Sequence, residues 1–236
     1  MSIITEIAKM IDHSLLSPTL TDEGLKEGCN LAKEYNVASV CVKPYAVKLA
    51  KEWLKDSDVL VGTVIGFPHG NSSIDVKVFE TQQALDDGAV EIDMVINLGK
   101  ATMEDWTYIE KEISAIREVT AKTNIILKVI FENDLITETN HKIKLCEICS
   151  KLKVDFVKTS TGYNYVKGAD GRYSYKGATD DDLKLMRKHS APEVQVKAAG
   201  AVGSLEAILR VRDLGVTRVG TGQTAQILDD ASVHYR

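Results

Sequence analysis

Cysteine is scarce in this sequence, and its histidines are scattered. The 236 residues include four cysteines, Cys29, Cys41, Cys146 and Cys149, too few for a disulfide scaffold in a chain of this length, so we expect reduced thiols. Cys146 and Cys149 are three residues apart, which puts both on one face of a helix, and no second Cys-x-x-Cys pair completes a zinc site. The five histidines form no His-x-His or His-x-x-x-His pair. We therefore predict no metal and no cofactor.

Long apolar runs and clusters of positive charge are missing as well. No stretch approaches the roughly 20 apolar residues of a membrane span. The first residues, MSIITEIAKM, lack the charged start, apolar core and cleavage site of a signal peptide. The formal net charge is -5, without a basic stripe or tail. These absences argue against nucleic acid and membranes as partners and favour a cytoplasmic protein that binds small molecules.

Short β-branched runs alternate along the chain with longer amphipathic stretches. Strands are expected at 9–15, 37–42, 59–66, 90–96, 124–130, 154–158, 193–197 and 216–220, and helices at 21–35, 45–55, 74–88, 104–122, 137–152, 179–189, 204–215 and 225–230. Eight strands, each followed by a helix, are typical of a (β/α)8 barrel. We predict one such α/β domain over residues 1–236. An open doubly wound sheet is the alternative.

Three of the expected apolar strands carry a single lysine, at Lys128, Lys158 and Lys197. One lysine at a strand end is ordinarily a surface residue whose stem lies along apolar atoms. Repetition on successive strands weakens that interpretation, because the carboxyl ends of barrel strands meet at one mouth. Asp93, within VEIDMVI, adds a carboxylate to the same set. The pattern predicts a site built from these four side chains.

Two ammonium groups beside one carboxylate predict a lysine that loses its proton readily. At about 5 Å and an effective dielectric near 20, their repulsion is roughly 3 kcal/mol, or about two pKa units. With desolvation added, a lysine pKa would fall from about 10.4 to near 7. A neutral amine attacks carbonyls, and the resulting iminium stabilises a carbanion without a metal. Lys158 is the predicted nucleophile and Asp93 the group that moves protons.

Glycines follow the seventh and eighth expected strands. Gly200 and Gly203 precede one helix, and Gly220 and Gly222 precede the last one. Exposed backbone amides and helix N-termini form anion sites, and barrels commonly hold a phosphate at these loops. The alternative is glycine required for the turns alone.

Several further residues allow two interpretations. Cys41, at the end of a strand, is either a packing residue, which we favour, or a thiol exposed to substrate. His13 and Ser14 either line the base of the site or form a buried hydrogen-bonded pair. The long segment 163–178 is either a surface insertion or a tyrosine-rich lid or subunit contact.

Six motifs together resemble the deoxyribose-phosphate aldolases. They are SVCVKPY at 39–45, GFPHG at 66–70, EIDMVIN at 91–97, LKVIFE at 127–132, FVKTSTG at 156–162 and VKAAG at 196–200. The resemblance covers most of the chain in order. It implies a class I, Schiff-base carbon–carbon lyase on a (β/α)8 barrel. Such an enzyme reversibly cleaves 2-deoxy-D-ribose 5-phosphate to acetaldehyde and D-glyceraldehyde 3-phosphate in deoxyribonucleotide catabolism.

The resemblance also implies roles for individual residues. Lys158 matches the imine-forming lysine, Lys197 the lysine that lowers its pKa, and Asp93 the proton-transfer aspartate. Substrate and phosphate are expected at Gly162, Gly200, Ala201, Gly220, Thr221 and Gly222, with Lys128 and Cys41 as further lining residues.

The chain departs from the family pattern in two loops and in the length of the segment from Tyr163 to Lys176, which is longer than expected. Ala201 replaces a usual glycine, and the loop at 220–224, Gly-Thr-Gly-Gln-Thr, lacks the usual serines. Backbone amides with Thr221 or Thr224 are the expected substitutes. The altered loop motivates a second hypothesis, a Schiff-base aldolase for another aldehyde acceptor, phosphorylated or unphosphorylated. The oligomeric state is left open, with a homo-oligomer among the partners considered.

Overall fold

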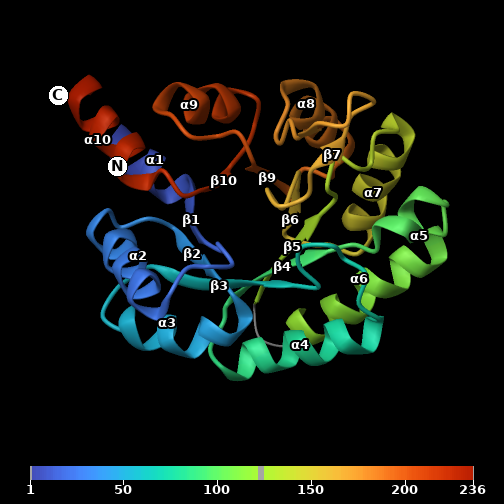
Figure 1. Cartoon of the computed structure of the whole chain (residues 1–236), viewed down its shortest axis with the longest axis horizontal. Helices are drawn as coiled ribbons and strands as arrows, with labels where there is room; N and C mark the ends of the chain where they lie inside the picture. Colours follow the sequence, from blue (N-terminus) through green and yellow to red (C-terminus); the bar gives the residue numbers. More distant parts are fainter. Residues whose placement is uncertain (1, 122–124, 236) are drawn as a thin grey trace.

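The strands of the chain close into a parallel barrel. The structure, a computed structural model, describes residues 2–121 and 125–235. The barrel strands neighbour one another in the order β1-β10-β9-β6-β5-β4-β3-β2. They are β1 Ile11–Leu15, β2 Ser39–Val42, β3 Leu60–Ile65, β4 Glu91–Val95, β5 Ile126–Ile130, β6 Phe156–Lys158, β9 Gln195–Ala199 and β10 Arg218–Thr221. Helices surround this barrel (Figure 1), which confirms the predicted (β/α)8 fold and excludes the open sheet.

The helices follow the strands as the amphipathic pattern predicts. They are α2 Asp22–Glu34, α3 Val47–Trp53, α4 Ile74–Asp86, α5 Leu98–Thr102, α6 Trp106–Thr120, α7 Thr139–Lys151, α8 Asp180–His189, α9 Leu205–Asp213 and α10 Thr224–His234, with a short 3-10 helix at Pro44–Ala46. Side chains of Thr21, Ser73 and Thr179 accept a hydrogen bond from a backbone N–H of the first turn, and so fix three of these starts. None of the helices that the structure describes is long and apolar enough to cross a membrane.

Two helices were not predicted, α1 and the short α5 between β4 and α6. α1, Ile3–Met10, runs without a loop into β1, so the expected strand at 9–15 begins only at Ile11. Ser2 caps its first turn by accepting from the Thr5 N–H. Lys122, the last residue of the predicted helix over 104–122, lies outside the described residues, and so does Asn124, the first residue of the predicted strand over 124–130. Met1 and Arg236 of the expected domain lie outside them as well.

The inside of the barrel is charged rather than apolar. Successive strand residues point alternately to the helices and to the barrel axis. In β4 this sends Ile92 and Met94 into the apolar layer under the helices, and Glu91 and Asp93 inward, fully buried. On this inner face, charged side chains pair with one another, as Lys128 does with Glu91 and Asp93.

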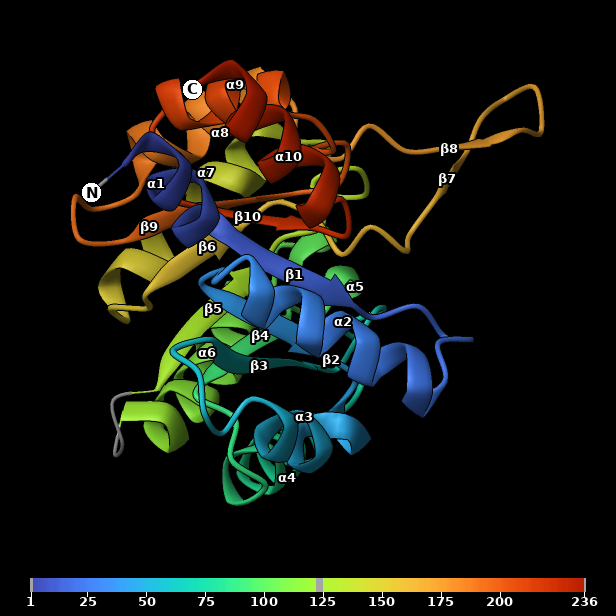
Figure 2. The ribbon, with the colours of Figure 1, turned by 90° about the vertical axis from the view of Figure 1, so that its left-hand side faces the viewer.

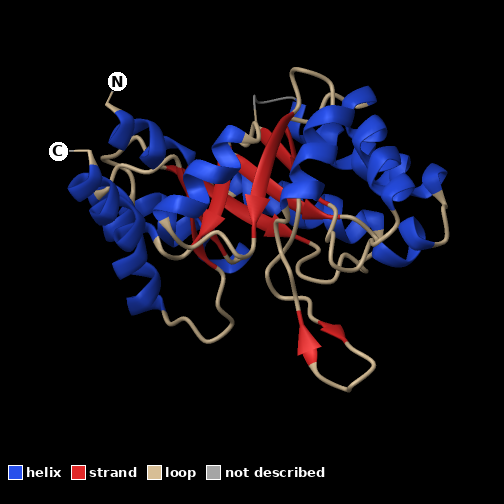
Figure 3. Cartoon of the chain, turned by 90° about the horizontal axis from the view of Figure 1, so that it is seen from above, coloured by secondary structure: helices blue, strands red, loops and turns tan. Residues whose placement is uncertain are grey.

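The segment at 163–178 contains a short antiparallel hairpin. β7, Val166–Lys167, pairs with β8, Tyr173–Ser174. It projects beyond the carboxyl ends of the barrel strands and stands clear of the helices (Figure 2, Figure 3). The segment is thus an ordered extension over the end of the barrel where the lysines lie, and not an irregular loop.

Candidate active site

Strand register places Lys158 beside Lys197. β6 pairs with β9 so that these two residues are direct neighbours, and β4 pairs with β5 so that Asp93 lies next to Lys128. Asp93 Oδ2 accepts a hydrogen bond from Lys158 Nζ at 2.7 Å and another from Lys197 Nζ at 2.7 Å. Lys197 also donates to Asp12. The structure thus brings together the three residues on which the predicted chemistry depends.

Lys128 lies deeper than predicted. Its Nζ donates to Glu91 Oε2 and Asp93 Oδ1, both at 2.6 Å, and its side chain is fully buried. In the register Lys128 is level with Phe156, two residues before Lys158, so it lies below the cavity. Lys128 is not one of the described residues that line the cavity, so the expectation that it lines the site is wrong. Its ammonium instead balances the buried carboxylates.

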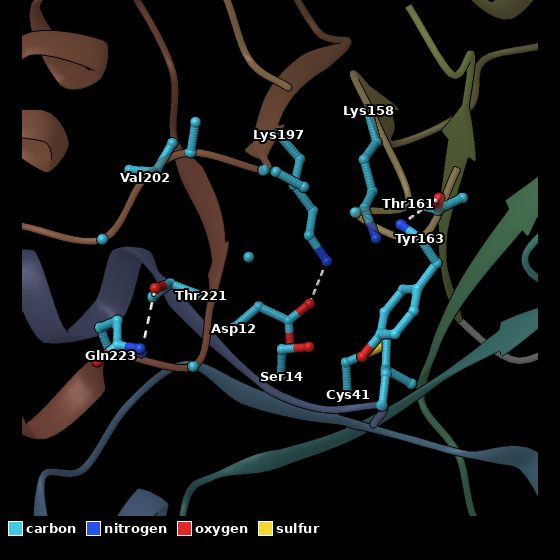
Figure 4. A pocket seen from close by; sticks show the side chains of 18 of the residues that line it. Asp12, Ser14, Cys41, Lys158, Thr161, Tyr163, Lys197, Val202, Thr221 and Gln223 are labelled. Carbon is cyan, nitrogen blue, oxygen red and sulfur yellow. Dashed lines mark hydrogen bonds and ion pairs between the residues drawn. The ribbon is translucent and has the colours of Figure 1, made fainter. Parts of the chain in front are cut away.

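The cavity above these charges has a volume of about 280 Å³. Lys158 and Lys197 point into it from one side, and Asp12, Ser14 and Cys41 lie opposite (Figure 4). All the residues predicted for substrate and phosphate line it: Gly162, Gly200, Ala201, Gly220, Thr221 and Gly222. Gly203, Tyr163, Tyr175 and Gln223 line it as well. One end is therefore built from amines and carboxylates, and the other from loop backbone.

Thr224 does not fill the role considered for it. It is fully buried at the start of α10, and its Oγ1 is 2.8 Å from Nδ1 of His13. This contact shows that His13 belongs to a buried hydrogen-bonded pair, whereas Ser14 lines the cavity. Thr221 lines the cavity too, and its Oγ1 already accepts from the Gln223 N–H at 3.2 Å.

The carboxylates hold depressed pKa values. Burial alone would raise the pKa of Asp93, but the ammonium groups of Lys128, Lys158 and Lys197 outweigh it and hold that pKa well below the usual range. Burial opposes the same effect at Asp12, where Lys197 and Lys128 lower the pKa to about 2. Both groups are therefore charged at neutral pH.

The two lysines shift in opposite directions. Burial lowers the pKa of Lys197, with help from the positive charges of Lys128 and Lys158. Burial also opposes charge on Lys158, but the Asp93 carboxylate in contact with its Nζ outweighs burial and raises the pKa of Lys158. The predicted depression of the Lys158 pKa by Lys197 is thus wrong, because the Asp93 carboxylate that both lysines share outweighs the repulsion between them.

Cys41 is a packing residue at the cavity wall. It is almost fully buried and packs with Leu16 and Val64. Burial raises the pKa of its thiol to about 12, so the thiol stays protonated. Donor atoms of Asp12, Cys41 and Asp93 lie within 4.8 Å of one another. These donors do not suit a metal ion, because the lysine ammoniums occupy the carboxylate oxygens and the thiol keeps its proton.

Asp12 is the ionisable residue that sequence reasoning missed. It lines the cavity, pairs with Lys197 and also accepts from the Ser39 hydroxyl at 2.8 Å. Its signal was a carboxylate inside the first apolar strand, the same signal that identified Asp93. Tyr175 was not singled out, because the sequence left segment 163–178 open between a surface insertion and a tyrosine-rich lid or subunit contact.

Comparisons with known proteins agree with this geometry. A family model described as DeoC/LacD family aldolase matches residues 6–222. A protein of Rhodopirellula baltica named deoxyribose-phosphate aldolase is 47% identical over 226 residues, covering 96% of this chain and 89% of that protein. One of Clostridium perfringens with the same name is 44% identical over 224 residues, covering 95% of each.

A solved structure extends the comparison to the fold. The deoxyribose phosphate aldolase from Aeropyrum pernix, described as tetrameric, has a TM-score of 0.84 at 25% identity, covering 96% of this chain and 91% of that one. The barrel, the paired lysines and the match over residues 6–222 lead to one conclusion. The chain belongs to the DeoC/LacD family of aldolases.

Proposed function

We propose that the protein is a class I aldolase that reversibly cleaves 2-deoxy-D-ribose 5-phosphate to acetaldehyde and D-glyceraldehyde 3-phosphate. One observation carries the proposal: two lysine amines share the Asp93 carboxylate at the closed end of a cavity whose other end is lined by loop backbone. The names of the relatives at 47% and 44% identity support this substrate, and a role in deoxyribose catabolism fits it.

Lys158 is the proposed nucleophile. Its ammonium is paired with Asp93, so attack requires that a proton leave Nζ. Lys197 and Asp93 are both within reach of that proton, because all three groups meet at Asp93 Oδ2. The Asp93 carboxylate, which already accepts from Lys158 Nζ, is the acceptor in contact with that proton. Lys197 Nζ donates to the same carboxylate oxygen, so the tuning role of Lys197 operates through the shared carboxylate.

The carbonyl chemistry then follows from the amine. Nζ adds to the C1 aldehyde, and loss of water gives an iminium at C1. The C3 hydroxyl loses its proton, the C2–C3 bond breaks, and its electron pair moves into the iminium to give an enamine. Glyceraldehyde 3-phosphate leaves, C2 takes up a proton, and water hydrolyses the iminium to release acetaldehyde. Asp93, directly or through one water, moves the protons of these steps.

Borohydride trapping tests the assignment. Acetaldehyde with borohydride should form a stable adduct on Lys158 of the wild-type protein, located by peptide mass mapping. Lys158→Leu should lose both the adduct and cleavage, because leucine fits a strand end and forms no imine. Lys184→Leu, at an exposed position on α8, is the control and should retain both. An adduct on Lys197 would mean that Lys197, and not Lys158, is the nucleophile. The lack of any adduct would contradict a Schiff-base mechanism.

A second candidate is an aldolase for an unphosphorylated acceptor. The loop at 220–224 has no serine, and its Thr224 hydroxyl is bonded to His13 and is not free for a substrate. Comparing kcat/KM for deoxyribose 5-phosphate and deoxyribose decides between the candidates. Similar values for the two sugars would favour the second.

Self-association is also proposed. The Aeropyrum pernix relative is described as tetrameric. Analytical ultracentrifugation of this protein would measure its own oligomeric state in solution. The cytoplasmic location stays a prediction.

A further inference from the structure

The hairpin places a tyrosine in the wall of the active-site cavity. Tyr175 follows β8 and lines the same cavity as Lys158 and Lys197. Its ring lies against Gly200, where an added Cβ would be 2.9 Å from the Tyr175 Cε2 atom. It also packs edge-to-face on Tyr165, with 5.4 Å between ring centroids. The ring is therefore held on two sides.

Both ends of the hairpin are tied to the barrel. On the returning side, the backbone N–H groups of Lys176 and Gly177 donate to Asp134 at 2.6 and 2.9 Å. On the outgoing side, Asn164 Nδ2 donates to Glu132 at 2.7 Å and to the Pro68 carbonyl at 2.9 Å. These bonds fix the position of Tyr175 relative to the cavity although the tip of the hairpin projects into solvent (Figure 2).

The Tyr175 hydroxyl can donate a hydrogen bond to a molecule in the cavity. Its oxygen accepts the Ala201 N–H at 3.3 Å, and its own proton has no acceptor among the residues that the structure describes. Accepting from an amide polarises a hydroxyl and strengthens its donation. The Ala201 N–H therefore strengthens the hydrogen bond that the Tyr175 hydroxyl can donate to a ligand.

The anion end of the cavity needs such a donor. Thr221 is the hydroxyl of its loop that faces the cavity, since Thr224 is bonded to His13. The two lysines lie at the opposite, imine-forming end, so the phosphate has to be held by neutral donors. A hydrogen bond to a charged acceptor is roughly twice as strong as one between neutral groups.

We propose that the Tyr175 hydroxyl binds the phosphate of the substrate and supplies the donor that the serine-free loop after β10 lacks. The inference rests on the proposed function and deepens it by naming a residue that selects phosphorylated over unphosphorylated sugar. Tyr175 contacts the phosphate and takes no part in the bond-breaking steps. Its loss should therefore change KM and leave kcat nearly unchanged.

Tyr175→Phe tests the proposal, because it removes one oxygen and keeps the ring that packs on Tyr165 and Gly200. KM for deoxyribose 5-phosphate should rise about tenfold or more, as expected for losing one hydrogen bond to a charged group. The kcat value, and kcat/KM for unphosphorylated deoxyribose, should stay within about twofold of wild type. Tyr173→Phe, at an exposed position of the same hairpin, is the matched control and should behave as wild type.

Isothermal titration with inorganic phosphate separates this inference from the proposed reaction. Phosphate should bind Tyr175→Phe about tenfold or more weakly than wild type, whether or not the protein turns over deoxyribose 5-phosphate. Equal phosphate affinity in both proteins would overturn the inference, and so would tighter binding by the variant, which would mean that the hydroxyl blocks the Ala201 amide. If wild type binds phosphate and forms no imine with acetaldehyde, the proposed function fails while the phosphate site stands.

Discussion

Ala201 has a backbone conformation that alanine rarely adopts. Its φ is 59°, in the left-handed region, which costs a residue with a Cβ roughly 1–2 kcal/mol. Glycine at this position removes the strain, which raises the free energy of unfolding. Its greater conformational freedom in the unfolded chain offsets part of that increase. Ala201→Gly should therefore raise the free energy of unfolding by about 0.5–1 kcal/mol, measured by urea denaturation.

Ala207→Gly is the control for this substitution. Ala207 lies within α9, where glycine should lower the free energy of unfolding by about 0.5–1 kcal/mol. The two variants should thus move in opposite directions. A loss of stability in both would show that the Ala201 side chain stabilises the loop more than its conformation strains it.

The grouping of the proposed catalytic residues could be predicted from sequence, and their charge states could not. Lys158, Lys197 and Asp93 stood out because each is ionisable within an apolar strand, and barrel geometry brings such residues to one place. The direction of the Lys158 pKa depends on which carboxylate oxygen lies against its Nζ. That contact is set by side-chain packing, which leaves no pattern along the chain.

At the scale of elements, the hairpin depends on two facing glycines. Gly177 has a φ of 66°, and a Cβ there would lie 2.7 Å from the Gly200 carbonyl carbon. Gly177→Ala should push the returning arm of the hairpin away from the loop after β9. The expected result is a KM for deoxyribose 5-phosphate raised by about tenfold, with borohydride trapping on Lys158 retained.

Gly171→Ala provides a matched control on the same hairpin. Gly171 has a φ of 79°, so alanine is strained there as well, but no atom lies within 4 Å of its added Cβ. This variant should keep the wild-type KM. A similar rise in KM for both variants would mean that strain in the hairpin, rather than its contact with Gly200, controls binding.

Helices and strands with a clear hydrophobic period and a residue that marks their boundary could be predicted from sequence. Those that lack either feature could not. Thr21, Ser73 and Thr179 mark helix starts in the sequence and cap them in the structure. α1 was missed because it passes directly into β1. The strands β7 and β8 have two residues each, too few for an alternating pattern to register.

At the scale of the whole molecule, the charged barrel interior links stability to pH. The pKa of Asp12 is lowered from its ordinary value of 3.8 to about 2, and that of Asp93 falls well below its ordinary value. A carboxyl group with a depressed folded-state pKa stabilises the fold above its unfolded-state pKa and loses that contribution as the pH falls through the folded-state value. Stability should therefore be constant near neutral pH and fall between about pH 5 and 2.

Guanidinium unfolding measured across this range checks the prediction. The shift at Asp12 alone is worth about 2 kcal/mol. Asp12→Asn should be less stable than wild type near neutral pH and lose less stability on acidification. Asp56→Asn, at an exposed position, should follow the wild-type curve. A wild-type curve that is flat down to about pH 2 would contradict the prediction.

The cavity draws its two ends from different kinds of structure, and this separation has an evolutionary consequence. The end proposed for imine formation is built on barrel strands whose register cannot slip without reorienting every inward side chain. The end proposed for the phosphate is built on loops and a projecting hairpin, which tolerate insertion and exchange. Mutations in the loops can therefore change the preference for the acceptor aldehyde while the lysines on the barrel strands stay unchanged. A library confined to residues 163–178 and 220–224 would search for new acceptor aldehydes while leaving Lys158, the proposed imine-forming lysine, and Lys197 in place.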